Sequence, residues 1–256
     1  MRFSRLRLVN RILCTFVLAL TVFAPAFAGD PQAVSGDRRL SHLAERLAAG
    51  LPVRIIAFGS SSTEGVGASS PAASYPSRLQ DALTAAWPPR QQVVVLNRGT
   101  GGEDADDMAR RLPMVIAEHP DLIIWQTGSN DPLRDLPLDR FVQETIAGVQ
   151  EIRAAHIDLM LMEPQLCRAL DGKPVSVSYR DALRGIGAGM DVPVIRRYDL
   201  MRRWLDDGVL TATQMLAPDG LHMADGGYAK LADTIAADIM RRTEPPRIAL
   251  DAQPHH

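Results

Sequence analysis

The chain has 256 residues, of which 46% are hydrophobic and 23% charged, and its formal net charge is −2 at pH 7. This length suits one ordinary domain with a core large enough to fold unaided, and no basic surplus points to a nucleic acid partner. Only two cysteines are present, which excludes a disulfide-rich scaffold.

Residues 1–28 have the pattern of an export signal. Four arginines stand in the first 11 residues, an apolar run covers 12–24, and Ala26-Phe27-Ala28 forms a small-x-small cleavage site. The run is short for a membrane span, although a retained anchor is the alternative. Cleavage removes four of the 28 basic residues and none of the 30 acidic ones, which leaves a net charge of about −6. We therefore expect a periplasmic or secreted protein with neither stable membrane insertion nor a nucleic acid partner, in which Cys167 has no disulfide partner.

The rest of the chain is predicted to contain three parts. Residues 29–50 form an N-terminal segment with a helix, residues 51–242 form the main domain, and residues 243–256 form a disordered tail.

Within these parts, short apolar stretches alternate with amphipathic ones. Strands are predicted over 53–58, 92–97, 121–126, 157–162 and 192–196. Helices are predicted over 41–49, 75–86, 108–115, 141–154, 179–188 and 228–239. This alternation favours a parallel, doubly wound sheet. Such sheets carry their chemistry at the carboxyl ends of the strands.

A glycine- and hydroxyl-rich turn, Gly59-Ser60-Ser61-Ser62-Thr63, follows the first strand. A phosphate loop would need a lysine here, and a dinucleotide loop would need a third glycine after Gly65-Val66-Gly67. The nucleophile elbow of α/β hydrolases would need glycine in place of Thr63. A serine activated in another way remains possible, as does a capped turn without chemistry.

The next two strands also end in polar turns. Three glycines precede Glu103 and Asp104, either of which can cap the following helix, and the turn exposes backbone N–H groups. Asn130 follows the third strand and can donate its amide into the same crevice. A flexible turn and an Asx turn before Pro132 are the respective structural alternatives.

Near the C-terminus, Asp219 and His222 stand three positions apart in a turn. This spacing lets the carboxylate orient one ring nitrogen while the other faces a nucleophile. His42, His119 and His156 have no such local partner, and no His or Cys cluster has zinc-ligand spacing.

Together these turns resemble the SGNH hydrolase superfamily, the Gly-Asp-Ser-Leu type of esterases and lipases. Gly59 to Thr63 corresponds to the first block, Gly102 to the glycine of the second, Gly128 to Asp131 to the third, and Asp219 to His222 to the fifth. The resemblance covers about residues 53–239. It implies a three-layer α/β/α fold with a five-stranded parallel sheet in flavodoxin-like order, and makes 51–242 the hydrolase domain.

By this resemblance, Ser61 is the nucleophile, with Asp219 and His222 completing a catalytic triad. Ser61, Gly102 and Asn130 would form the oxyanion hole, and no metal or organic cofactor is expected. The chain departs from the family at two positions, where Ser60 replaces an aspartate and Ser62 a leucine, so that the assignment of Ser61 rests on register.

The resemblance implies an esterase that acts on a small or polymer-borne ester. Export and the short polar insertions, such as 132–139, favour short acyl groups on glycans. A lipase, lysophospholipase or thioesterase of the same fold is the alternative, and a glycan-binding module without catalysis is the second.

Overall fold

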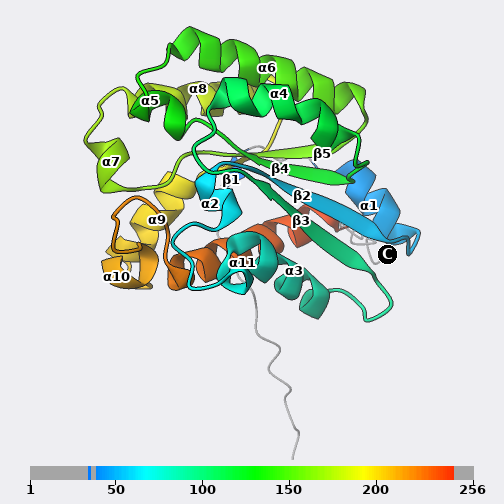
Figure 1. Cartoon of the computed structure of the whole chain (residues 1–256). Helices are drawn as coiled ribbons and strands as arrows, with labels where there is room; N and C mark the ends of the chain where they lie inside the picture. The colour runs from blue at the N-terminus through cyan, green and yellow to red at the C-terminus, as the bar shows by residue number, and fades with distance from the viewer. Residues whose placement is uncertain (1–33, 36–38, 245–256) are drawn as a thin grey trace, which may run out of the picture.

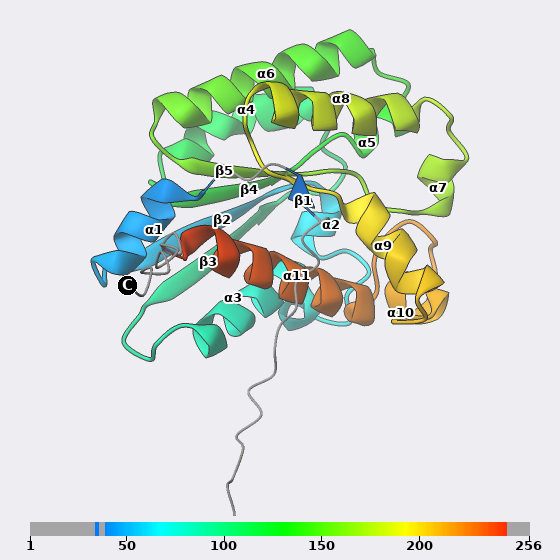
Figure 2. The same ribbon diagram turned by 180° about the vertical axis from the view of Figure 1, so that it is seen from behind.

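The computed structural model describes residues 34–35 and 39–244. The predicted export signal therefore lies outside the described residues, as does the predicted tail beyond Glu244. The described residues form three layers, with a central sheet between two layers of helices (Figure 1, Figure 2).

Five of the strands are parallel, in the order β6-β5-β4-β2-β3. Their bounds are β2 Val53–Gly59, β3 Val93–Gly99, β4 Leu122–Gln126, β5 Asp158–Met162 and β6 Val194–Ile195. This is the flavodoxin-like order, so the predicted fold class is confirmed. A two-residue strand, β1 Val34–Ser35, adds an antiparallel edge beside β6 that the sequence did not predict.

The longer helices cover the two faces of the sheet. One face carries α4 Ala105–Ile116, α6 Leu138–Ala154 and α8 Ser176–Gly189, and the other carries α1 Ser41–Ala48, α3 Tyr75–Ala86 and α11 Asp225–Thr243 (Figure 1). Each buries an apolar stripe. On α3, for example, Tyr75, Leu79 and Leu83 are fully buried, at the positions where the helical period placed them.

Several short helices follow the carboxyl ends of the strands, on the left in Figure 1. They are α2 Ser61–Glu64, α5 Asn130–Leu133, α7 Arg168–Asp171, α9 Arg197–Asp206 and α10 Ala212–Met215. A 3₁₀ turn, Pro71–Ala73, precedes α3. None of these short helices was predicted from the sequence. Four of them have only four residues, too few for a periodic signal, and they form because the loops pack against one another.

One side chain of α3 occupies part of the outer edge of the sheet at β3. Gln80 of α3 donates from Nε2 to the Val93 carbonyl over 2.9 Å and accepts from the Val95 N–H over 2.6 Å. These are backbone groups of the last strand in the sheet order. Gln80 therefore occupies ladder positions that a further strand would need.

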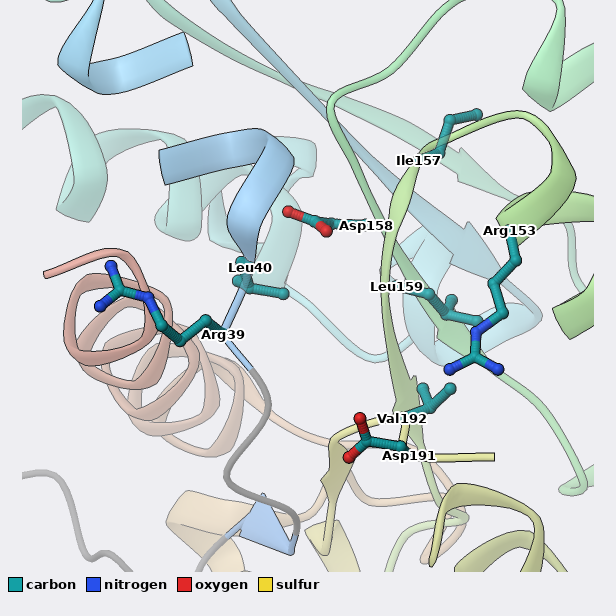
Figure 3. A pocket seen from close by; sticks show the side chains of 8 residues that line it. All are labelled: Arg39, Leu40, Arg153, Ile157, Asp158, Leu159, Asp191 and Val192. Carbon is teal, nitrogen blue, oxygen red and sulfur yellow. The ribbon is translucent and has the colours of Figure 1, made fainter. Parts of the chain in front are cut away.

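A small hollow lies beside the amino end of β5, on the side of the sheet away from β3. Figure 3 shows Arg153, Asp158 and Asp191 among the side chains that line it. Asp158 Oδ2 accepts the Leu43 N–H of α1 over 2.9 Å. None of the site residues predicted from the sequence lines this hollow.

No helix within residues 39–244 has both the length and the apolar composition needed to cross a membrane.

Candidate active site

The chain adds β3 on one side of β2 and β4 on the other, and Ser61 lies just after β2, at the point where the strand order reverses. β2 ends at Gly59 and α2 begins at Ser61, so the chain turns sharply within two residues. A Cβ on Gly59 would lie 2.4 Å from Thr63 Oγ1 and 2.8 Å from Gln126 Oε1. Only glycine fits there, and its absence of a side chain lets the turn close directly over the end of β4.

Ser61, His222 and Asp219 lie in one hydrogen-bonded line. His222 Nε2 is 2.9 Å from Ser61 Oγ, and His222 Nδ1 is 2.7 Å from Asp219 Oδ2. An ionised carboxylate can only accept, so Nδ1 carries the proton in this arrangement. In the neutral ring, Nε2 is then free to accept the proton of the Ser61 hydroxyl.

Two backbone groups hold the Asp219 carboxylate. Oδ1 accepts the N–H groups of Leu221 and His222, both over 2.9 Å. The bond from the His222 N–H is the main reason that the pKa of Asp219 falls to about 2. Asp219 is therefore ionised across the neutral range and remains a hydrogen-bond acceptor for the ring.

The loop after α2 supports His222 from behind. Gly67 has a φ of +90°, and a Cβ there would lie 2.9 Å from His222 Cβ and 2.5 Å from the Met223 carbonyl. Tyr228 donates its hydroxyl to the Val66 carbonyl over 2.6 Å. The loop that follows Ser61 and the loop that carries His222 are thus packed directly against each other.

The three expected oxyanion donors come from the turns after β2, β3 and β4. Among the hydrogen bonds of the described residues, none is donated by the N–H of Ser61 or of Gly102. Asn130 Nδ2 donates one N–H to the Glu103 carbonyl over 2.6 Å, which ties α5 to the glycine-rich turn. An amide has two N–H groups, so the other is available for a ligand.

The Asp131 carboxylate holds the start of α4, directly after the glycine-rich turn. Its Oδ1 accepts the Ala105 N–H at the start of α4 over 3.1 Å, while its buried Oδ2 has no partner in the described part of the chain. Burial raises the pKa of Asp131 to about 6. Asp104 caps α4 in a capping box with Asp107. Of the two residues that could cap this helix, Glu103 and Asp104, it is therefore Asp104 that does so.

Gln126, the last residue of β4, has a role in the site that was not predicted from the sequence. Its Oε1 accepts from Ser60 N at 3.0 Å and Ser60 Oγ at 3.1 Å. It also accepts from Ser62 Oγ and Thr63 Oγ1, each at 3.3 Å. Gln126 thereby anchors the serine triplet on both sides of Ser61. A polar residue that ends the otherwise apolar stretch Leu122–Trp125 is the only local signal of this role.

The other histidines within residues 39–244 lie away from these residues. His42 Nε2 is 3.1 Å from Asp121 Oδ1, and His119 and His156 follow the ends of α4 and α6 with φ values of +52° and +57°. Within residues 39–244, no group of three or more His, Cys, Asp and Glu side chains is arranged as metal ligands would be.

Comparison with known proteins gives a family match over most of the chain. The model of the non-GDSL lipase-like family matches residues 28–242. An arylesterase of Vibrio mimicus is 25% identical over 169 residues, which cover 66% of this chain and 79% of that protein. The thioesterase 1/protease 1/lysophospholipase L1 of Escherichia coli K12 is 24% identical over 163 residues, covering 61% and 74%.

Solved structures share the fold at lower identity. A two-domain esterase active on acetylated mannans superposes with a TM-score of 0.69 at 18% identity, over 85% of this chain and 56% of that one. At this identity the likeness concerns the fold alone. The family match over residues 28–242 shows that the chain belongs to the non-GDSL lipase-like family of the SGNH hydrolase superfamily, and the related arylesterase and thioesterase indicate a carboxylic ester hydrolase.

Proposed function

We propose that this protein is an exported serine esterase in which Ser61 is the nucleophile, His222 the general base and Asp219 the residue that orients the base. The observation that carries the proposal is the continuous line from Ser61 Oγ to His222 Nε2 at 2.9 Å and from His222 Nδ1 to Asp219 Oδ2 at 2.7 Å. A serine hydroxyl needs such a base because it is a weak nucleophile at neutral pH.

The reaction follows from these positions. His222 takes the proton of Ser61 as Oγ attacks the ester carbonyl, and the tetrahedral oxyanion accepts hydrogen bonds from the N–H groups of Ser61 and Gly102 and from the Asn130 amide. His222 then gives the proton to the leaving alcohol, which leaves the acyl group on Ser61. Water, deprotonated by His222, attacks the acyl carbonyl, and His222 returns that proton to Ser61 Oγ as the bond to the acyl carbon breaks and the carboxylic acid leaves. Every proton transfer is made by side chains of this chain.

We propose short acyl esters on glycans, of the O-acetyl type, as the substrates. The connection from α5 to α6 spans only Arg134 to Pro137, and so adds no long apolar cover over the site. The fold-level likeness to an esterase active on acetylated mannans supports the same class. The alternative is a lipase, lysophospholipase or thioesterase activity, which the name of the Escherichia coli relative favours.

Export is part of the proposal and rests on residues 1–28. Their arginine-rich start, apolar run and Ala26-Phe27-Ala28 site have the order that secretion signals need. The hydrolase domain of residues 51–242 would then act in the periplasm or outside the cell, after the signal has been cleaved.

A nitrophenyl ester series from acetate to palmitate tests the reaction and the acyl length together, with Ser61→Ala as the blank. We expect the highest kcat/KM on acetate, and release of acetate from an acetylated glycan. A maximum on long acyl chains would favour the lipase alternative. No hydrolysis above the blank on any chain length would contradict the esterase itself.

A further inference from the structure

A buried arginine contacts the serine triplet, and the proposed reaction assigns no role to it. Arg197 is the first residue of α9, at the carboxyl end of β6, and its side chain is fully buried. In residues 39–244, no carboxylate forms an ion pair with it. Burial of a charged group without a counter-charge is costly, and such groups are concentrated at functional sites.

Its guanidinium donates to three uncharged acceptors. Nε donates to the Glu163 carbonyl over 3.0 Å, Nη1 to Ser62 Oγ over 2.9 Å, and Nη2 to Gln165 Oε1 over 2.7 Å. Burial lowers the pKa of Arg197 to about 10, so the group is still charged at neutral pH. The rigid fork of the guanidinium fixes these acceptors relative to one another.

Two of these contacts connect Arg197 to the chain segments that carry Ser61 and His222, the proposed nucleophile and base. Ser62 follows Ser61 directly in α2, so Nη1 holds the turn that carries the nucleophile. Gln165 donates from Nε2 to the Leu221 carbonyl over 3.2 Å, and Leu221 directly precedes His222. The Nη2 contact thus reaches the loop that carries the base.

The same side chains also close a loop behind the nucleophile. Gln126 accepts from Ser62 with its oxygen and donates from Nε2 to Ser129 Oγ over 3.2 Å. Ser129 donates to Gln165 Oε1, also over 3.2 Å. Ser62, Gln126, Ser129, Gln165 and Arg197 are all at least 95% buried, so this network is shielded from solvent.

We propose that Arg197 is a positioning residue of the ester hydrolysis, which sets the spacing between Ser61 and His222 by holding Ser62 directly and Leu221 through Gln165. This inference rests on the proposed catalytic roles of Ser61 and His222. Ester attack is sensitive to this spacing, since a shift of about 1 Å in the reacting groups can cost about 100-fold in rate.

The variant Gln165→Glu separates positioning from stability. The introduced carboxylate still accepts from Arg197 and Ser129 and gives the guanidinium a counter-charge, but it cannot donate to the Leu221 carbonyl. We expect a Tm equal to or above that of the wild type, with kcat lowered by about 10- to 100-fold and KM little changed. Labelling of Ser61 by a serine-reactive phosphonate should slow by a similar factor.

Arg197→Met provides a second measurement, with Arg242→Met as the matched control. Arg242 is buried to a similar degree and pairs with Asp238 in the last turns of α11, at the opposite end of that 19-residue helix from the loop that carries His222. Both variants should lose stability. Only Arg197→Met should lose kcat at temperatures where both are folded, by about 100-fold. If Arg197→Met does not fold, Gln165→Glu decides alone.

Wild-type kcat and labelling rate in a folded Gln165→Glu protein would overturn the inference. Equal losses of kcat in Arg197→Met and Arg242→Met would do the same. Ser61→Ala, measured in parallel, identifies which claim has failed. If Ser61→Ala remains active, the proposed function is wrong, whereas if it is inactive and Gln165→Glu is fully active, only the role of Arg197 is wrong.

Discussion

His222 Nε2 lies 2.9 Å from Ser61 Oγ, although 161 positions separate the two residues along the chain. The serine leaves the first long strand, while the histidine precedes the last helix, α11. The two side chains meet only because the turn after β2 and the loop before α11 are brought together at one end of the sheet. Their separation measures the integrity of the whole sheet as well as the chemistry of the site.

The serine triplet supplies the first prediction. Ser61→Ala should abolish turnover with the Tm retained, whereas Ser60→Ala and Ser62→Ala should keep measurable activity, because only Ser61 Oγ is within reach of His222. A serine-reactive phosphonate, read by mass spectrometry of the labelled peptide, should modify Ser61. Modification at Ser60 or Ser62 would move the nucleophile.

Asp219→Asn should leave the loop folded but reverse the hydrogen-bond role of the side chain toward the ring. An amide nitrogen facing Nδ1 favours the tautomer with the proton on Nε2, which cannot accept from Ser61. We expect kcat to fall by about 10⁴-fold. A steady-state assay on nitrophenyl acetate measures this loss, and a decrease below about tenfold would show that the ring is oriented by other groups.

For Asn130, the expected effect is on the transition state. Asn130→Ala should lower kcat by about 100- to 1000-fold while KM changes little, because the donor acts mainly on the charge of the oxyanion. The melting temperature controls for loss of the bond to the Glu103 carbonyl. If turnover stays at the wild-type value and only KM rises, Asn130 is a substrate contact instead.

Asp131 predicts a dependence of stability on pH. Its folded-state pKa of about 6 lies above the unfolded value of about 3.9, so the folded state binds the proton more tightly. This contribution is fully present below the unfolded pKa and is lost as the pH rises through about 6. By pH 8 the loss of this contribution amounts to at most about 3 kcal/mol, and Asp131→Asn, which mimics the protonated form, should recover it.

Denaturation of both proteins at pH 4 and pH 8 checks the effect of Asp131. Asp131→Asn should be the more stable of the two at pH 8, and this advantage should shrink towards pH 4. A variant that is less stable than the wild type at pH 8 would mean that the ionised Oδ2 has a favourable partner.

Export can be tested on the protein itself. We expect the mature chain to begin near Gly29, because Ala26-Phe27-Ala28 has the small residues that signal cleavage requires. N-terminal sequencing of the protein from the periplasm or the medium gives the answer. A chain that keeps its first 28 residues and is recovered with the membranes would support the retained anchor.

Local patterns carried much of the fold. The helix expected over 75–86 is found at Tyr75–Ala86, since its apolar stripe is regular and Pro88 and Pro89 stop it. The central strands agree with their apolar runs within one or two residues. The fifth strand, expected over 192–196, is only Val194–Ile195, because its pairing with β5 covers just those two residues.

The supporting residues of the site were beyond local reasoning. Ser61, Asn130 and His222 stand in short motifs, and their spacing is visible in the sequence. The roles of Gln126, Gln165 and Arg197 depend on contacts between the ends of β2, β4, β5 and β6. The only local sign of them in the sequence is that Gln126 ends an apolar stretch. The α9 helix was missed as well, although Leu200, Met201 and Trp204 form its buried stripe.

The contact of Gln80 with the edge of β3 bears on how the protein behaves at high concentration. An open outer strand offers its backbone to any neighbouring chain and so invites sheets to grow from one molecule into the next. Here the amide of a single glutamine already occupies the Val93 carbonyl and the Val95 N–H. Replacement of Gln80 would expose these two backbone groups to neighbouring molecules and so favour aggregation through β3. Engineering of the α3 surface should therefore leave Gln80 in place.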